Sequence, residues 1–558
     1  MAYFLKQSKK KGRTYLAIYE SFYNPEKKET AHKTFKSLGS VETHIKNGIK
    51  DPITYFQREV DRLNSERACK QIKKISDKSP VRYLGYFILK ALMDKLDIRK
   101  NVNAFNLVNN FKYDLFDLLS ALVYSRSVEP CSKLRTYNEV IPSLFEKHDF
   151  SYDQLMDCVS FLGENYEKFV EIFTYMTNRK YKIETEKTYF DCTNFYFEID
   201  REDSFRKKGP SKEKRNDPIM GLGLLLDRNQ IPIGMKMFPG NESEKPVLRD
   251  VIKSLKNKNN IKGRTVHVAD KGLNCAQNIA FSKGDGNGYL FSKSVKGLPE
   301  QERRWVLISE GYIDVKNSKG KTLYRYKSCV DKFPYTFEHD GRKVTVKMTE
   351  KRLVTYNPSL AAKQKYEINR MVEKAKLLKL SKAKKSEFGE SAKYVIFKGK
   401  DGEKACVGLN TKAIKKDLAC AGYNMLVTSE TEMSEKDMYD TYHQLWRIEE
   451  SFKIMKSDLD ARPAFERTEY SIKGHFLVCY ITVLLERLFQ FKILKSEFST
   501  NEIFRFLKGL KVIKAENKYI NATRDSDLIK TLAEKYKLPL DNYYLTQTQI
   551  NSILKFKL

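Results

Sequence analysis

The chain contains 558 residues, of which 41% are hydrophobic and 12% aromatic, so it is long enough for several domains with buried cores. This composition excludes a wholly disordered protein. Because 103 Lys and Arg residues stand against 71 Asp and Glu residues, the net charge is +32, which favours a polyanionic partner such as nucleic acid.

The sequence carries no signal for a membrane or for secretion. Its longest apolar run, 476–485, is far shorter than a membrane span, and the charged N-terminal stretch lacks the apolar segment of a signal peptide. The nine cysteines are scattered without a CxxC pair, which is typical of reduced thiols rather than of zinc ligands or disulfides. We therefore expect a cytoplasmic protein.

Residues 1–80 begin with extended, alternating segments. The segments 13–19 and 30–38 flank a turn at 24–25, which predicts a basic β-hairpin. From 81 to 180 the apolar residues recur at three- and four-residue spacing, which predicts a helical domain.

An α/β core is expected over 181–294. Its first segment, 188–199, is apolar on both faces, which is typical of a central strand covered on both sides. A connecting helix is expected at 247–255. Further strands are expected at 219–227, 232–238, 265–270 and 289–294.

The stretch 295–420 departs from this pattern and is interpreted as a β-rich insertion with a Lys-rich helix. Core sequence returns over 421–495, and 496–558 is expected to form a small helical end. In the insertion, strands are expected at 305–308, 322–326 and 343–348 and a helix at 361–382; in the returning core, a strand is expected at 424–428 and helices at about 435–458 and 471–492.

Three carboxylates stand out. Asp191 lies inside an apolar strand, where a charge is costly unless it is paired or bound to a metal. Asp270 ends a strand, where α/β sheets present functional groups. Tyr442, Glu449 and Lys456 recur every seven residues, so we expect them on one stripe of a helix. Two strand carboxylates and one helix carboxylate suit a pair of Mg²⁺ or Mn²⁺ ions about 4 Å apart for in-line phosphoryl transfer.

Each carboxylate also has a purely structural interpretation. Asp191 is then an edge or capping Asp, and Asp270 is a turn former before Lys-Gly. Glu449 is then an exposed helix acid paired with Lys453.

A resemblance to a known family is carried by four stretches: YFDCTNFYFE, GPSKEKRNDPIMGLGLLLDRNQIPIGMKMFPGNESE, VHVADKGLNCAQN and YHQLWRIEESFKIMKSDLDARP. They resemble DDE transposases of the insertion-sequence-four superfamily, more narrowly its sixteen-thirty-four-like group, and the similarity covers most of the chain. The resemblance implies a ribonuclease H-like core interrupted by a β-rich insertion, into which the long step from Asp270 to Glu449 fits. It also implies that Asp191, Asp270 and Glu449 hold two Mg²⁺ or Mn²⁺ ions and are the catalytic residues.

The superfamily's helix signature is a Tyr, an Arg three residues later, then a Glu and a Lys. Tyr442 and Lys456 match it, and the resemblance implies that both contact phosphates at the transposon end. Leu445 stands where the Arg belongs, and Arg462 in the following loop is a candidate to replace it.

Three further residues are weaker candidates for DNA binding. Lys212 and Arg215 match the family's Gly-x-Ser-Lys-x-x-Arg loop, for which the alternative is a solvated loop. Trp305, in the insertion, is expected either to stack on a flipped base or to lie in a core.

The resemblance implies a bacterial, nucleoid-associated transposase. It would bind the terminal inverted repeats of its own insertion sequence through the helical domain 81–180, cut the DNA there and join it to a target. Such a reaction synapses two ends, which implies a homodimer, with DNA and no membrane as partner. The alternatives are a catalytically idle DNA-binding protein derived from a transposase and a ribonuclease H-fold nuclease that cuts without joining.

Overall fold

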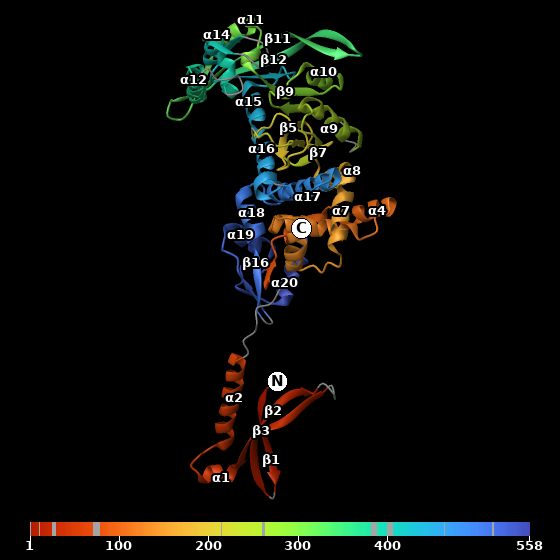
Figure 1. Cartoon of the computed structure of the whole chain (residues 1–558), viewed down its shortest axis with the longest axis vertical. Helices are drawn as coiled ribbons and strands as arrows, with labels where there is room; N and C mark the ends of the chain where they lie inside the picture. Colours follow the sequence, from red (N-terminus) through yellow and green to blue (C-terminus); the bar gives the residue numbers. More distant parts are fainter. Residues whose placement is uncertain are drawn as a thin grey trace. The chain divides into compact units, whose positions relative to one another are not determined.

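The structure is a computed structural model that describes residues 2–10, 12–24, 29–70, 79–213, 215–258, 263–380, 388–398, 405–462, 464–515 and 518–558. The chain separates into two compact units, Met1–Lys78 and Ser79–Leu558 (Figure 1). None of the helices that the structure describes is both long and apolar enough to cross a membrane.

The first unit is an antiparallel sheet with helices beside it. Its elements are β1 (Tyr3–Lys10), β2 (Arg13–Asn24), β3 (Glu29–Ser40), α1 (Val41–Lys46) and α2 (Pro52–Lys70). The expected hairpin is formed by β2 and β3, and β1 adds a third strand on the other side of β2. Leu16 and Ile18, which alternate along β2, are buried, as are Phe56 and Val60 of α2. The burial of alternate residues of β2 shows that α2 packs on one face of the sheet.

The second unit contains a helical region built around α17 (Glu469–Leu488), which is buried along almost its whole length. The surrounding helices are α3 (Phe87–Lys95), α4 (Ile98–Asn109), α5 (Leu115–Val128), α6 (Lys133–Arg135), α7 (Tyr152–Glu164) and α8 (Tyr166–Tyr181), and π-helix η6 (Phe489–Ile493) extends α17. Glycines bring α7 and α17 into backbone contact, since a Cβ on Gly163 would lie 1.7 Å from the carbonyl oxygen of Tyr470. The region 81–180 is thus mainly helical, and α17 packs among its helices.

A nine-stranded mixed sheet runs through the same unit in the order β10-β11-β12-β15-β9-β8-β5-β6-β7 (Figure 1). Its core strands are β5 (Lys187–Tyr196), β6 (Ile219–Leu226), β7 (Pro232–Pro239), β8 (Val266–Ala269), β9 (Gly288–Lys293) and β15 (Tyr423–Thr428). β8 pairs in parallel with β5 and with β9, and the other pairs are antiparallel. These strands confirm the core strands predicted from the sequence, with small shifts at their ends.

Helices cover both faces of this sheet, which accounts for the apolar runs of its strands. Phe195 of β5 packs against Phe476 of α17, with the ring centroids 4.6 Å apart. On the other face, Phe190 and Cys192 belong to the cluster around α9 (Glu244–Lys258) and α10 (Ala276–Gly284). Because neighbouring residues of a strand point to opposite faces, Asp191 lies on the α17 side.

The insertion extends the core sheet instead of forming a separate β domain. Its elements are η3 (Val295–Gly297), α11 (Glu300–Leu307), β10 (Ile313–Lys316), β11 (Thr322–His339), β12 (Arg342–Tyr356), α12 (Pro358–Leu380), η4 (Gly389–Tyr394), β13 (Val395–Lys398), β14 (Ala405–Leu409) and α14 (Thr411–Ala419). The prediction of a strand at 305–308 is wrong, because this segment belongs to α11 and its last residue follows that helix. A four-residue apolar run does not distinguish a strand from a helix, and here Val306 alone is buried.

The C-terminal end is mixed rather than purely helical. Its elements are α18 (Thr500–Gly509), β16 (Lys511–Ala515), β17 (Lys518–Asn521), α19 (Asp527–Tyr536), β18 (Tyr544–Leu545) and α20 (Gln547–Leu554). The three strands form a sheet with β4 (Val81–Tyr83), which precedes the helical region in the chain. Because these strands are short and one partner is remote in sequence, the pattern around 496–558 predicted only helices.

A carboxyl group is buried near the C-terminal end of α17. Glu486 has an exposed fraction of 0%, and its nearest cation is the guanidinium of Arg487, 3.7 Å away. Among the described residues, neither carboxyl oxygen has a hydrogen-bond partner. Burial therefore raises the pKa of Glu486 from 4.5 to about 7. Above that pH the folded chain holds a desolvated charge.

We expect Glu486→Gln to stabilise the protein at pH 8 and to have little effect near pH 4.5. A carboxyl whose pKa is higher in the folded state stabilises the fold at low pH, and this contribution is lost as the pH rises towards 7. Removing the charge should raise the free energy of unfolding at pH 8 by up to about 3 kcal/mol, measured by denaturant titration. Glu310→Gln, at an exposed position, is the control. The same small change in both variants would contradict the prediction.

Candidate functional site

Asp191 and Asp270 are neighbours at the junction of β5 and β8. In this parallel pair Phe190 is the register partner of Ala269, and each is followed directly by its aspartate. Phe190 and Ala269 belong to the same apolar cluster, so both aspartates point to the other face of the sheet. Because neighbouring strands lie about 4.8 Å apart, the two carboxyl groups are close.

Asp270 is held as an anion. Ser292 Oγ on β9 donates a hydrogen bond to Asp270 Oδ1 at 2.8 Å, and the Tyr442 hydroxyl donates to the same oxygen at 2.9 Å. Burial alone would raise the pKa of Asp270, but these hydrogen bonds and one from the backbone of Lys271 lower it below its ordinary value. Tyr442 comes from α15 (Glu435–His443), so one helix of the returning core contacts the second aspartate directly.

The ionised form of Asp191 is less stable than that of Asp270. Burial raises its pKa to about 6; the carboxylates of Glu244 and Asp270 add to this effect, and Lys212 opposes it. Lys212 Nζ lies 3.8 Å from Asp191 Oδ1 and 3.7 Å from Glu244 Oε1, and it also donates to the carbonyl of Cys192. The site therefore already accommodates a cation between carboxylate oxygens. Oxygen donors of this kind suit Mg²⁺ or Mn²⁺.

Glu449 is not brought into this pair. It lies in the first turn of α16 (Trp446–Lys453), which packs against β5, but its side chain is exposed. Among the residues that the structure describes, no group of three or more His, Cys, Asp and Glu side chains is placed to hold a metal ion. The two aspartates thus lie side by side, and the convergence of all three carboxylates stays a prediction.

Tyr442, Glu449 and Lys456 lie on three successive helical segments and not on one continuous α-helix, so their alignment on one stripe stays a prediction. Between α15 and α16 the hydrogen bonds run to the third preceding residue, as from Leu445 to Tyr442. The last part is the π-helix η5 (Ile454–Asp458). The backbone is wound more tightly between α15 and α16 and more loosely in η5. The rotation per residue therefore differs from that of a regular α-helix at both places.

Basic side chains gather where β5 ends. Lys456 Nζ lies 3.1 Å from Glu213 Oε1, and Arg462 contacts the other oxygen of the same carboxylate. The guanidinium of Arg462 lies 5.1 Å from the ring centroid of Tyr196, and that of Arg215 lies 3.8 Å from it. We call Arg215, Lys456 and Arg462 the β5 basic cluster. Lys456 of η5 and Arg462, which follows η5, thus contact the same carboxylate, that of Glu213.

The remaining candidates lie in other surroundings. Leu445 is largely buried in the apolar cluster around α17, so the Arg of the signature is replaced here by a core side chain. Trp305 is half-buried in α11, with Lys327 Nζ 4.8 Å from its ring centroid. It packs against the cluster on the α9 side of the sheet.

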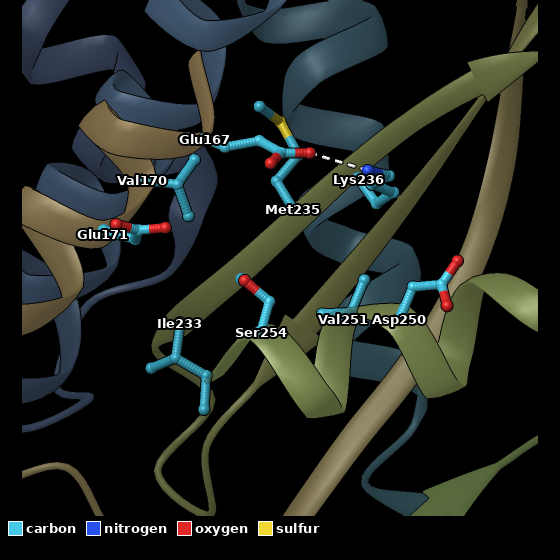
Figure 2. A pocket seen from close by; sticks show the side chains of 10 residues that line it. Glu167, Val170, Glu171, Ile233, Met235, Lys236, Asp250, Val251 and Ser254 are labelled. Atoms are coloured by element: carbon cyan, nitrogen blue, oxygen red, sulfur yellow. Dashed lines mark hydrogen bonds and ion pairs between the residues drawn. The ribbon is translucent and has the colours of Figure 1, made fainter. Parts of the chain in front are cut away.

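Two hollows lie near these elements. One of about 340 Å³ adjoins the aspartate pair and is lined in part by Lys212, Glu244 and Gly272. A smaller cavity of about 110 Å³ lies between α8, β7 and α9, where Figure 2 shows Glu167 reaching across to Lys236 at 2.6 Å. None of the predicted site residues lines the smaller cavity. Lys212 lines the first hollow, and Arg462 lines a further one of about 420 Å³.

Sequence reasoning did not single out Glu213, Glu244 or Ser292. Glu213 and Glu244 lie within the long stretch that carried the family resemblance, so their position was a usable signal. Ser292 ends up beside Asp270 through the pairing of β8 with β9, and no local pattern marks it.

A family model described as a transposase DDE domain matches residues 186–485, which is more than half of the chain. Among solved structures, the chain is similar to the cryo-EM structure of a piggyBac transposase synaptic complex with hairpin DNA. That similarity has a TM-score of 0.37 and 11% sequence identity, and it covers 79% of this chain and 81% of that chain. No curated protein matches the chain.

Proposed function

Because the chain belongs to the transposase DDE domain family, we propose that it binds the terminal inverted repeats of its own insertion sequence, cuts the DNA there and joins the ends to a target. The observation that carries the proposal is the pair Asp191 and Asp270, side by side on β5 and β8 within the matched segment. As part of this proposal, the strands in the order β7-β6-β5-β8-β9 would form a ribonuclease H-like core. Membership in the insertion-sequence-four superfamily is part of the proposal.

Asp191, Asp270 and Glu449 would together hold two Mg²⁺ or Mn²⁺ ions. Such ions activate water or a 3′-hydroxyl as the nucleophile and stabilise the leaving oxygen. For this, the ammonium of Lys212 leaves the carboxylate of Asp191. The side chain of Glu449 would turn towards the aspartates from the first turn of α16. Arg487 of α17 holds α16 in position through an ion pair with Glu450 at 3.1 Å.

Glu244 is the alternative third carboxylate, because it already shares Lys212 with Asp191. Comparing Glu449→Gln with Glu244→Gln distinguishes the two assignments. The residue that holds the metals is the one whose replacement stops cleavage and also weakens binding of Mn²⁺ to the protein.

Tyr442 would position Asp270 through its hydrogen bond, and the β5 basic cluster would contact phosphates of the DNA end. Two ends must be synapsed for joining, so we propose a homodimer in the active complex. Trp305 stays a candidate for stacking on a flipped base. The ammonium of Lys327 lies over its ring and would have to move before a base could stack there.

The decisive experiment is to incubate the protein with Mg²⁺, the end of its element and a target plasmid, and to sequence the products. Joined products support a transposase. Cut ends without joining indicate a nuclease of the same fold, and binding without cutting indicates an idle DNA-binding protein.

We expect Glu213→Gln to tighten DNA binding several-fold. Burial alone would raise the pKa of Glu213, but Lys456 and Arg462 hold it below its usual range, so the side chain is an anion placed between two predicted phosphate contacts. Removing this anion frees positive charge, so the dependence of log Kd on log salt should steepen by about one counterion. Titration of labelled DNA at several salt concentrations measures both effects.

Glu186→Gln is the matched control, since Glu186 is ion-paired with Arg228 outside the cluster. If both variants bind DNA like the wild type at every salt concentration, Glu213 is not a competitor of the phosphates.

A further inference from the structure

The first unit presents an open sheet face that combines basic and aromatic side chains. Along β1 and β2 the pairs Phe4 with Tyr19, Lys6 with Ala17, Ser8 with Tyr15 and Lys10 with Arg13 alternate with pairs that point the other way. Because alternate residues of a strand share a face, these eight side chains lie on one side of the sheet. We call Lys6, Lys10, Arg13, Tyr15 and Tyr19 of this set the open face.

The opposite face is the one that α2 covers. Tyr3, which pairs with Glu20, donates its backbone N–H to Asn64 of α2 at 2.7 Å. Arg67 of α2 lies 2.7 Å from Glu20. Leu16 on this side of β2 is buried. The helix therefore fixes which face is open.

The cations of the open face are exposed, and Arg13 also interacts electrostatically with Glu42 of α1. Lys6, Lys10, Arg13 and Tyr15 are exposed, and Lys6 Nζ lies 4.6 Å above the ring of Tyr19. On the helix side, by contrast, Lys33 is paired with Glu20. Lys and Arg outnumber Asp and Glu two to one over residues 1–78. Exposed cations interleaved with aromatic rings favour a nucleic acid over a protein partner.

The shape of the face favours duplex DNA. The side chains of the open face come from β1 and β2, two antiparallel strands that lie about 4.8 Å apart and form a two-stranded ribbon. A β-ribbon of this kind fits the major groove of B-form DNA, which is about 12 Å wide, whereas the major groove of duplex RNA is deep and narrow. An exposed Tyr15 near the ribbon's turn suits contact with base edges or with sugars in such a groove.

We infer that the open face of the first unit is a second, separate binding site for duplex DNA, seated in the major groove. It belongs to a different unit from the aspartate pair, so it supplies affinity to the protein without taking part in cleavage. The inference rests on this unit alone and stands whether or not the proposed transposition activity is correct.

The test measures binding of the full-length chain to a short DNA duplex over a series of salt concentrations. The double variant K6A/R13A should weaken binding about tenfold and reduce the salt dependence by about two counterions. K33A/K36A is the matched control, because both lysines are ion-paired with acids on or beside the helix side, Glu20 and Glu59, and the net charge change is the same. This control should change binding less.

Two further measurements complete the test. Tyr15→Ala should weaken binding without changing the salt dependence, because the ring carries no charge. Duplex RNA of the same sequence should compete poorly with the DNA. Equal losses in K6A/R13A and K33A/K36A would overturn the inference, and so would single-stranded DNA or RNA that competes as well as the duplex.

The outcome is distinguishable from failure of the proposed activity. K6A/R13A should cut normally once enough protein is added to saturate the DNA. A protein that never cuts would still show the difference between the two double variants. Thermal unfolding of each variant checks that the sheet is intact.

Discussion

Asp191→Asn is expected to abolish DNA cleavage and leave DNA binding unchanged. The substitution keeps the shape of the side chain and removes the negative charge that a divalent metal requires. A catalytic metal contributes several kcal/mol to stabilisation of the transition state, so cleavage in Mg²⁺ should fall by about 1,000-fold or more. Single-turnover cleavage of a labelled transposon end measures the rate, and a binding titration with the same DNA measures the affinity.

The same variant should be more stable than the wild type at neutral pH. The pKa of Asp191 is raised to about 6, so its ionised form is disfavoured in the folded chain and costs stability above that pH. A substitution that stabilises the protein while removing its activity is typical of a functional residue held at some cost to the fold.

Asp227→Asn is the control. Asp227 follows β6, is more deeply buried than Asp191, and has its pKa raised to about 6 by burial, but it accepts a hydrogen bond from the backbone of Ile231 at 2.8 Å instead of facing Asp270. Its replacement should change stability and leave the rate per folded molecule intact. Near-normal cleavage by Asp191→Asn in Mg²⁺ would show that the aspartates have been misassigned.

Asp191 and Asp270 could be singled out in the sequence because their signals are local. An aspartate inside an apolar strand and another at the end of a strand need no knowledge of distant segments, and the parallel pairing of β5 with β8 then brings them together. Glu449 was placed by assuming a regular helix. The tightened turn at Leu445 and the π-helix η5 break that assumption, and neither has a clear signature in the sequence.

Interactions between remote segments were not predictable in the same way. Glu213 meets Lys456 and Arg462 only because the loop after β5 folds back onto the end of η5. β16 pairs with β17 and with β4, although β4 lies at the start of the second unit and β16 near the end of the chain. These strands have too few residues to give a periodic pattern. The insertion was predicted as β-rich, but nothing in its sequence indicated that β12 pairs with β15 of the core.

Lys456→Ala is expected to weaken assembly of the complex with the cleaved DNA end and to flatten its salt dependence by about one counterion. Lys456 lies in η5 beside Phe195, and its ammonium shares the carboxylate of Glu213 with Arg462. A phosphate that replaced this carboxylate would meet both cations at once. Since Leu445 is a core residue, Arg462 is the side chain placed to supply the guanidinium that the helix signature lacks here.

Arg462→Ala should therefore resemble Lys456→Ala, and the double variant should lose less than the sum of the two, because both cations act on one phosphate. Lys453 is exposed and lies one turn earlier, at the end of α16. Lys453→Ala removes the same charge close to Lys456 and should have little effect. Assembly is measured by native gel electrophoresis of pre-cleaved ends at increasing salt. If Lys456→Ala assembles and cuts like the wild type at raised salt, Lys456 is a solvated residue, and the family resemblance of this helix reduces to Glu449.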